Sequence, residues 1–346
     1  MRVNDPSFIN PTPLTRMNPS TLLQPVLASL QQLVPADNAL LMSASRYALN
    51  KPGKLIRPTV SMLLGKALTG ETRPSVVEAA AVAELIHVAT LLHDDVIDES
   101  PLRRGKPTVH AQWDNRTAIL SGDFLLAQAS LKLAAIGVVP VIRIFSQVLA
   151  DLCDGEMTQG QLAFDVDGST WAIYEQKTYG KTASLFAASA ESAAILSDAP
   201  QSCIDACRAY GRGVGMAFQL MDDWLDFTQT PETLGKPSQD DLRHGLLTAP
   251  VLLALSPGVL EASQAEHLKE RLKTFFKDPQ KQSKALDESL LLIEQAATIE
   301  KTRALAEAHV EQALLALKVV PEEQIKDLAS WQALMVLAKN VTQRYG

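Results

Sequence analysis

The sequence predicts an all-α protein in which many helices form one bundle. Long segments rich in Ala and Leu carry apolar residues at spacings of three and four, and Gly or Pro falls between these segments. Runs that alternate in β-branched residues are almost absent. Among the 346 residues, 47% are hydrophobic and 21% are charged, as in soluble globular proteins with a large core. No linker rich in Pro, Ser or Gly is long enough to separate two domains, so we expect a single helical domain over residues 22–346.

Each expected helix is an apolar-periodic segment that ends where Gly or Pro interrupts the period. In chain order, the predicted helices cover residues 22–33, 58–68, 76–96, 118–135, 141–161, 171–196, 202–225, 250–255, 285–317 and 322–344. Ala and Ser dominate residues 183–194, which lets helix backbones approach closely. Residues 1–21 contain four prolines and no apolar core of a secretory signal, so we expect a loose N-terminal extension there.

Charge and composition exclude several classes of protein. Lys and Arg number 32 against 39 Asp and Glu, a formal charge of −7, which argues against a general nucleic-acid binder. The most apolar stretch, residues 125–142, is interrupted by Gln128, Ser130 and Lys132, so we expect no transmembrane segment. The three cysteines show neither a disulfide framework nor paired metal spacing, which favours a reducing compartment and a cytoplasmic location.

One acidic pattern occurs twice. The chain reads LLHDDVID over residues 91–98 and QLMDDWLD over residues 219–226, each with the motif Asp-Asp-x-x-Asp. In a helix, the first and last aspartates of the motif share a face, and the second is rotated by about 100°. The carboxylates concerned are Asp94, Asp95 and Asp98 in the first motif, and Asp222, Asp223 and Asp226 in the second.

A single motif of this kind is most simply a solvated acidic helix end. Two copies, each preceded by apolar residues, favour another explanation, because crowded carboxylates cost stability unless cations lie between them. Oxygen ligands suit Mg²⁺, which keeps several waters and commonly bridges carboxylates to phosphates. Zinc is disfavoured because no Cys or His cluster accompanies the motifs. We therefore expect a diphosphate held by metal.

Basic residues occur beside the first motif and upstream of it. PLRRGKP supplies Arg103, Arg104 and Lys106, and GKLIRP supplies Lys54 and Arg57. Arginine binds phosphate oxygens bidentately, and lysine acts as a point charge. Surface charges that balance neighbouring acids remain the alternative explanation.

These motifs together resemble the trans-isoprenyl diphosphate synthases, over about Leu22 to the C-terminus. Six of them occur in the order found in that family: GKLIRP, HDDVIDESPLRRG, GDFLLA, GKT, AFQLMDDWLD and LGKPSQDDL. The resemblance implies an all-α fold around a deep central cavity, usually as a homodimer. It also implies successive 1'-4 condensation of isopentenyl diphosphate onto an allylic diphosphate, farnesyl or geranylgeranyl, with three Mg²⁺ ions in each active site.

The resemblance assigns roles to particular residues. Asp94, Asp98 and Asp222 would ligate Mg²⁺ directly, with Asp95, Asp223 and Asp226 in support. Residues that would bind the allylic diphosphate are Arg103, Lys181, Thr182, Gln219 and Lys236, of which Lys181 joins the aspartates as catalytic. Residues that would bind isopentenyl diphosphate are Lys54, Arg57, His87 and Arg104.

Some of these residues have simpler explanations. His87 and Gln219 could equally be packed, hydrogen-bonded side chains of helices, and His93 is undecided. The family often continues the second motif as Gly-Lys-x-Thr-x-Pro, but here the segment 245–250 reads GLLTAP, so Leu246 stands where a phosphate-contacting lysine is usual.

The same resemblance implies that the residues four and five positions before the first motif set the product length. Thr90 and Ala89 are small there, which predicts a tunnel for a product of about C30 to C45 and leaves open a membrane contact for its release. Alternatives are a geranylgeranyl or farnesyl diphosphate synthase, or a regulatory subunit of a heteromeric synthase. A terpene cyclase is disfavoured because it needs no second diphosphate pocket, for which Lys54, Arg57 and Arg104 are present here. A phosphoryl-transfer enzyme is disfavoured because no GxxxxGK[ST] loop occurs.

Overall fold

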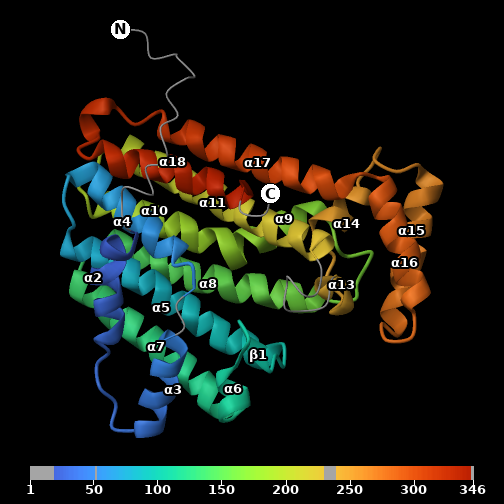
Figure 1. Ribbon diagram of the computed structural model, residues 1–346, viewed down its shortest axis with the longest axis horizontal. Coiled ribbons are helices and arrows are strands. Elements are labelled where there is room, and N and C mark those ends of the chain that lie inside the picture. Colours follow the sequence, from blue (N-terminus) through green and yellow to red (C-terminus); the bar gives the residue numbers. More distant parts are fainter. Residues whose placement is uncertain (1–18, 51–52, 230–238, 344–346) are drawn as a thin grey trace. The chain divides into compact units, whose positions relative to one another are not determined.

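The computed structural model describes residues 19–50, 53–229 and 239–343, and these residues are mostly helical (Figure 1). The first helices are α2 (Pro19–Gln31), α3 (Ala39–Leu49), α4 (Ile56–Thr69), α5 (Pro74–Ile97), α6 (Val109–Gln112), α7 (Asn115–Ile136) and α8 (Val139–Leu162). They are followed by α9 (Trp171–Thr178), the π-helical turn η1 (Tyr179–Ala183), α10 (Ser184–Ile195), α11 (Gln201–Thr228), α13 (Asp240–Arg243), α14 (Ala249–Ala254), α15 (Ala262–Lys277), α16 (Ser283–Gln295), α17 (Thr298–Leu317), the 3-10 turn η2 (Glu322–Gln324) and α18 (Leu328–Gln343). Within the described ranges the only sheet is a hairpin of β1 (Leu102–Arg103) and β2 (Lys106–Pro107). The predicted all-α fold is confirmed.

The chain divides into two compact units. Unit 1 comprises Met1–Phe145, Ala188–Arg208 and Ala316–Asn340, and unit 2 comprises Ser146–Ala187, Ala209–Leu315 and Val341–Gly346. The first aspartate motif belongs to unit 1 and the second to unit 2, so each motif has its surroundings within its own unit.

The core of unit 1 is built on α5. This helix packs against α4 and most extensively against α7, because its alanines let the neighbouring backbones approach closely. Ala80, Ala81 and Ala83 are 0% exposed. By length and composition both α5 and α7 are apolar enough to cross a membrane, but 67% of the most apolar window of α5 and 33% of that of α7 are buried inside the protein. For α5 the apolar character therefore serves the core.

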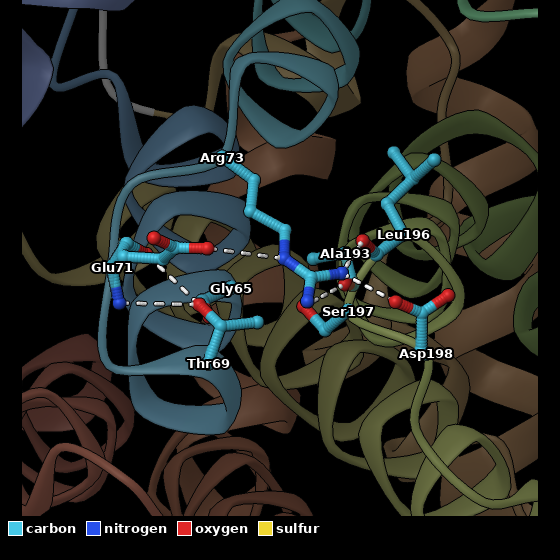
Figure 2. A network of polar contacts seen from close by, with 8 residues as sticks. All are labelled: Gly65, Thr69, Glu71, Arg73, Ala193, Leu196, Ser197 and Asp198. Carbon is cyan, nitrogen blue, oxygen red and sulfur yellow. Dashed lines mark hydrogen bonds and ion pairs between the residues drawn. The ribbon is translucent and has the colours of Figure 1, made fainter.

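The turn between α4 and α5 is joined to the end of α10 by Arg73 (Figure 2). Its Nη1 donates to the Leu196 carbonyl at 3.0 Å and to Asp198 Oδ2 at 2.6 Å. On the other side, Arg73 Nε lies 3.7 Å from Glu71 Oε1. One arginine thus satisfies a carbonyl near the carboxyl end of α10, where helix carbonyls lack partners within the helix.

In unit 2, α8 and η1 touch backbone to backbone at two glycines. A Cβ at Gly155 would lie 3.1 Å from Lys181 N and 3.3 Å from the Lys177 carbonyl. A Cβ at Gly180 would lie 2.7 Å from the Asp151 carbonyl. Gly180 leaves no room for a side chain without a backbone shift, and at Gly155 a Cβ would be in unusually tight contact with backbone atoms. The contact fixes the backbone that carries Lys181.

Several predicted helices differ from those observed. The expected helix over residues 171–196 is interrupted by η1, a single π turn of the kind often found at functional sites. The expected helix over 285–317 is two helices, α16 and α17, because Ala297 has φ 53°. The segment 322–344 begins with η2, and α18 starts at Leu328.

Two longer helices were not predicted, although both carry recognisable start signals. The Asn38 side chain accepts a hydrogen bond from the Leu41 N–H at the start of α3. Glu261 and Gln264 form a capping box at the start of α15. Of the expected N-terminal extension, residues 1–18 lie outside the described residues, and residues 19–21 already belong to α2.

Candidate functional site

The first aspartate motif forms the carboxyl end of α5, and its three carboxylates have different surroundings. Asp95 is buried, its Oδ1 accepts a hydrogen bond from Arg103 Nε at 2.7 Å, and Arg103 Nη2 forms an ion pair with the same oxygen at 2.7 Å. Asp94 is half-buried and Asp98 is exposed. Burial raises the pKa of Asp95, whereas Arg103 opposes that rise. The structure thus leaves Asp94 and Asp98 accessible while Asp95 holds the hairpin arginine.

The hairpin after α5 turns at Arg104 and Gly105, which have φ of 53° and 71°. Positive φ at Arg104 is uncommon for a residue with a Cβ, and such conformations often occur at functional positions. The Arg104 guanidinium packs on the backbone of Gly53, where any Cβ would overlap it. The absence of a side chain at Gly53 thus leaves room for the Arg104 guanidinium in this position.

A pocket of about 530 Å³, part of it open to solvent, lies within unit 1 beside the first motif. Its charged and polar lining residues include Tyr47, Glu84, His87, Asp95, Arg103 and Arg104. Arg57 is half-buried and acts electrostatically on both Glu84 and His87, and Lys54 is exposed. Of the residues expected to bind isopentenyl diphosphate, His87 and Arg104 line the pocket, and Arg57 acts on the lining residues Glu84 and His87 electrostatically.

The charges around this pocket favour an anionic occupant. Burial lowers the pKa of His87 well below 6.5, and Arg57, Arg104 and Arg103 lower it further. Burial raises the pKa of Glu84, against the opposing effect of Arg57 and Arg104. A neutral His87 beside three arginines can donate a hydrogen bond to an anion without adding to the existing repulsion.

The second motif lies near the end of α11, and its centre is Asp223. This carboxylate is 1% exposed and accepts three hydrogen bonds. Tyr174 OH and the Ala249 N–H donate to Oδ2 at 2.6 and 3.1 Å, and Gln219 Nε2 donates to Oδ1 at 2.9 Å. Burial and the charge of Asp241 raise the pKa of Asp223, and the three hydrogen bonds lower it. Asp223 therefore has the surroundings of a structural anchor.

The flanking residues of unit 2 continue this network. Thr182 Oγ1 donates to Gln219 Oε1 at 2.9 Å, so that Gln219 links Thr182 to Asp223. Lys181 Nζ lies 2.5 Å from Glu156 Oε2 on α8. The structure brings together Lys181, Thr182 and Gln219 within this unit, whereas Lys236 lies outside the described residues.

The two outer aspartates of the second motif also differ. Asp226 is buried, and its Oδ1 accepts a hydrogen bond from the Asp240 N–H at 3.2 Å. Asp222 is exposed. In both motifs, the residues expected to ligate metal directly are the accessible ones, and Asp95, Asp223 and Asp226 are buried among protein partners.

Asp94 and Asp98 in unit 1, and Asp222 in unit 2, carry carboxylate oxygens, the ligand type that Mg²⁺ prefers. Across residues 19–50, 53–229 and 239–343, no group of three or more His, Cys, Asp or Glu side chains is arranged to hold a metal ion.

His93, undecided from the sequence, packs between α5 and α7. Its Nε2 lies 3.1 Å from the Ile119 carbonyl and 3.5 Å from Asp123 Oδ1. The ring lies directly on Gly122, where a Cβ would overlap it. The glycine of the GDFLLA motif therefore accommodates a histidine of the first aspartate motif.

The residues expected to set product length lie on α5. Ala89 is fully buried, as are Leu85 and Ile86 one turn earlier. Thr90 is half-buried, and its hydroxyl donates to the His87 carbonyl at 2.9 Å.

Three residues of these sites were missed by the sequence analysis. Glu84, Glu156 and Tyr174 are each the partner of a predicted residue, and each comes from a different part of the chain. For Glu84 there was a signal, because an acid in the middle of the apolar helix α5 needs a partner when buried. Glu156 pairs with Lys181 and Tyr174 pairs with Asp223 through tertiary contacts, which the spacing of residues in the sequence does not reveal.

Comparison with known proteins assigns the family. The sequence model of the polyprenyl synthetase family matches residues 38–289. A prenyl transferase of Cyanophora paradoxa is 39% identical, covering 91% of this chain and 93% of its own, and solanesyl-diphosphate synthase 2 of Oryza sativa subsp. japonica is 39% identical, covering 86% of this chain and 72% of its own. Among solved structures, heptaprenyl diphosphate synthase from Staphylococcus aureus superposes with a TM-score of 0.85 at 31% identity, covering 95% of this chain and 99% of its own.

A second solved structure was determined with ligands. The polyprenyl synthase from Caulobacter crescentus, complexed with calcium and isoprenyl diphosphate, has a TM-score of 0.83 at 30% identity and covers 96% of this chain and 98% of its own. Family model, relatives and solved structures agree with one another. This chain belongs to the polyprenyl synthetase family, whose members are prenyltransferases that use a divalent metal.

Proposed function

We propose that this protein is a long-chain trans-polyprenyl diphosphate synthase. It condenses isopentenyl diphosphate with an allylic diphosphate, farnesyl or geranylgeranyl, by repeated 1'-4 addition. The observation that carries the proposal lies within unit 1, where a pocket lined by Arg103, Arg104 and His87 adjoins the accessible carboxylates of the first aspartate motif. An anion pocket beside acidic groups that can bind metal suits a diphosphate substrate.

Isopentenyl diphosphate occupies the unit 1 pocket in this proposal. Arg57 and Arg104 bind its phosphate oxygens, His87 donates a hydrogen bond, and Lys54 contributes charge from the rim. Glu84 lies buried among the two arginines and holds them in place. The electrostatic relation of Glu84 to both guanidinium groups supports this positioning role.

The allylic diphosphate is bound by a different set of residues from those that bind isopentenyl diphosphate. Arg103, Lys181, Thr182, Gln219 and Lys236 would contact it, and Asp94, Asp98 and Asp222 would hold Mg²⁺, three ions per site by the family resemblance. When bound, the metal would supply Lewis-acid stabilisation of the charge on the departing diphosphate. The chain's own cations add to this effect because they are fixed before the charge develops.

The product is proposed to be about C30 to C45 long. The small, buried Ala89 and the neighbouring Thr90 on α5 support a tunnel that admits a long tail. Apolar walls also keep water from the allylic cation that forms when the C–O bond breaks. The relative named solanesyl-diphosphate synthase supports a long product.

We further propose a cytoplasmic homodimer. On α7, Ile119, Leu120 and Leu131 are 43%, 48% and 51% exposed, and apolar side chains gathered on one helix suit a protein contact. Cys153, Cys203 and Cys207 are free thiols, as expected in a reducing compartment. Sedimentation equilibrium should give twice the chain mass, and a monomer at micromolar concentration would contradict the dimer.

The function is tested by incubating the purified chain alone with Mg²⁺, farnesyl diphosphate and labelled isopentenyl diphosphate. We expect prenyl diphosphates of C30 or longer. Products that stop at C20 or below would contradict the length. If product forms only after a second subunit is added, the chain is a regulatory subunit and not a synthase.

A further inference from the structure

A second pocket, of about 300 Å³, lies within unit 2. Its walls include Gln159, Tyr174, Lys177, Leu246, Leu247 and Leu252. Lys177 is the only charged residue among the described residues that line it. The other lining residues are four leucines and four neutral polar residues. A half-buried ammonium group in such a pocket loses part of its solvation, so its presence there needs an explanation.

The described part of the chain gives Lys177 little compensation. Its Nζ donates to Gln159 Oε1 at 3.5 Å, a long contact, and lies 5.8 Å from the centroid of the Tyr174 ring. No carboxylate within the described ranges forms an ion pair with it, in contrast to Lys181, which pairs with Glu156 at 2.5 Å. Burial lowers the pKa of Lys177, against the opposing charges of Asp223, Asp241 and Glu156.

The backbone presents Lys177 next to Lys181. The two lysines are four residues apart, where α9 continues into η1, so they are separated by about one helical turn. Gly155 packs against both of them, since a Cβ added to this glycine would lie 3.3 Å from the Lys177 carbonyl and 3.1 Å from Lys181 N. The same close contact therefore fixes both lysines, and Lys181 already belongs to the proposed diphosphate site.

Leu246 lines this pocket without adding a charge to it. This residue stands where the family resemblance leads to a lysine, and it lines the same pocket as Lys177. Its N–H is bound to the Asp241 carbonyl at 2.9 Å, so the position is held by the backbone. Apart from Lys177, the described residues that line the pocket around Leu246 thus carry no charge.

We propose that Lys177 binds the diphosphate of the allylic substrate and supplies the positive charge that Leu246 does not. This inference rests on the proposed function and adds a residue to its allylic site. A diphosphate oxygen is a ligand that a lysine can reach as a point charge without a fixed geometry. Binding of this anion would replace the solvation that the buried ammonium group has lost.

The first test compares Lys177→Met with Lys301→Met, a matched change at an exposed lysine of unit 2. We expect Lys177→Met to raise the KM for the allylic diphosphate about tenfold or more and to leave the KM for isopentenyl diphosphate unchanged, because a charge-assisted hydrogen bond contributes roughly that much. Lys177→Arg should retain most of the affinity, and Lys301→Met should match the wild type. Equal rises in both KM values would overturn the proposal.

The decisive variant is the double substitution Lys177→Met with Leu246→Lys. If the two positions serve the same anion, a lysine at 246 restores the allylic KM that Lys177→Met has lost. A purely structural role of Lys177 would not be rescued in this way, so absence of rescue contradicts the proposal. Should Lys177→Met fail to fold, Lys177→Gln with and without Leu246→Lys decides the question in the same manner.

Binding of inorganic diphosphate with Mg²⁺, followed by calorimetry, separates this inference from the proposed function. We expect Lys177→Met to bind diphosphate about tenfold more weakly than the wild type and the double variant to recover. An unchanged Kd in Lys177→Met overturns the role of Lys177 even if the wild type elongates prenyl chains. A wild type that binds diphosphate through Lys177 but forms no prenyl product contradicts the proposed function alone.

Discussion

Asp222 and Asp223 are neighbours in the chain with opposite surroundings, and the same contrast separates Asp94 from Asp95. Asp223 is buried and accepts three hydrogen bonds, whereas Asp222 is exposed. A buried acceptor orients the helix and its neighbours, and an exposed one is available to metal and substrate. We therefore propose that in each motif the buried aspartates stabilise the fold and the more accessible ones bind metal and substrate.

Asp223→Ala and Asp222→Ala form a matched pair that tests this division. We expect Asp223→Ala to lower the free energy of unfolding by at least about 2 kcal/mol, because it leaves Tyr174, Gln219 and the Ala249 N–H without their acceptor. Asp222→Ala should change it by less than about 0.5 kcal/mol and still abolish most activity. Urea unfolding with parallel assays would refute the division if the two variants lost stability equally.

His87 gives a pH signature. Its pKa lies well below 6.5 in the folded protein, while the unfolded chain has the ordinary value. As the pH falls below 6.5, the unfolded chain takes up a proton that the folded protein does not, so stability falls until the folded pKa is reached. Above pH 6.5 the histidine is neutral in both states, and its protonation no longer affects stability.

We expect His87→Asn to flatten this dependence. Between pH 6.5 and the folded pKa, the slope of unfolding free energy against pH should decrease by up to about 1.4 kcal/mol per pH unit. Urea titrations at a series of pH values measure it, with His267→Asn, a change at an exposed histidine of α15, as the control. Identical slopes in wild type and His87→Asn would show that His87 is not held neutral.

The contact between α8 and η1 positions the two lysines of unit 2 that are proposed to bind diphosphate. Gly155 and Gly180 let the two backbones approach closely. The π turn η1 carries Lys181, which forms an ion pair with Glu156 on α8. Lys177 and Lys181 both depend on this contact. A methyl group at the interface should therefore affect fold and binding together.

Gly155→Ala is expected to lower stability by about 1–3 kcal/mol, because its new methyl group would lie 3.1 Å from Lys181 N and 3.3 Å from the Lys177 carbonyl, so the backbone must shift to admit it. Gly160→Ala, in the same helix but with no neighbouring atom within 4 Å of where its methyl group would lie, should raise stability by about 0.5–1 kcal/mol through helix propensity. Thermal unfolding of the two variants compares them directly. Two shifts of the same sign would mean that the close contact is not the cause.

In this proposal, the residues of α5 that precede the first motif set the product length. Ala89→Phe should shorten the main product, because an aromatic ring would fill space along the tail. Overpacking costs about 1–3 kcal/mol, so the variant's thermal unfolding must be checked first. Ala304→Phe, at an exposed position of α17, serves as the control. An unchanged product distribution in a folded Ala89→Phe protein would place the floor elsewhere.

Across the whole molecule, sequence patterns predicted what is local and missed what depends on tertiary contacts. Apolar periodicity and Gly or Pro breaks located most helices, and Gly70 and Gly137 do adopt the left-handed conformation that ends α4 and α7. The aspartate spacing singled out the motifs, but it could not show that Asp95 is held by Arg103 or Asp223 by Tyr174. Polar helices such as α15 were missed because their apolar stripe is narrow.

Metal dependence of condensation by the chain alone tests the account most directly. The purified protein, stripped with a chelator, should incorporate no labelled isopentenyl diphosphate, and addition of Mg²⁺ should restore chain elongation in the wild type but not in Asp94→Asn. Elongation that persists after chelation, or full magnesium-restored activity in Asp94→Asn, would contradict the role assigned to the accessible carboxylates.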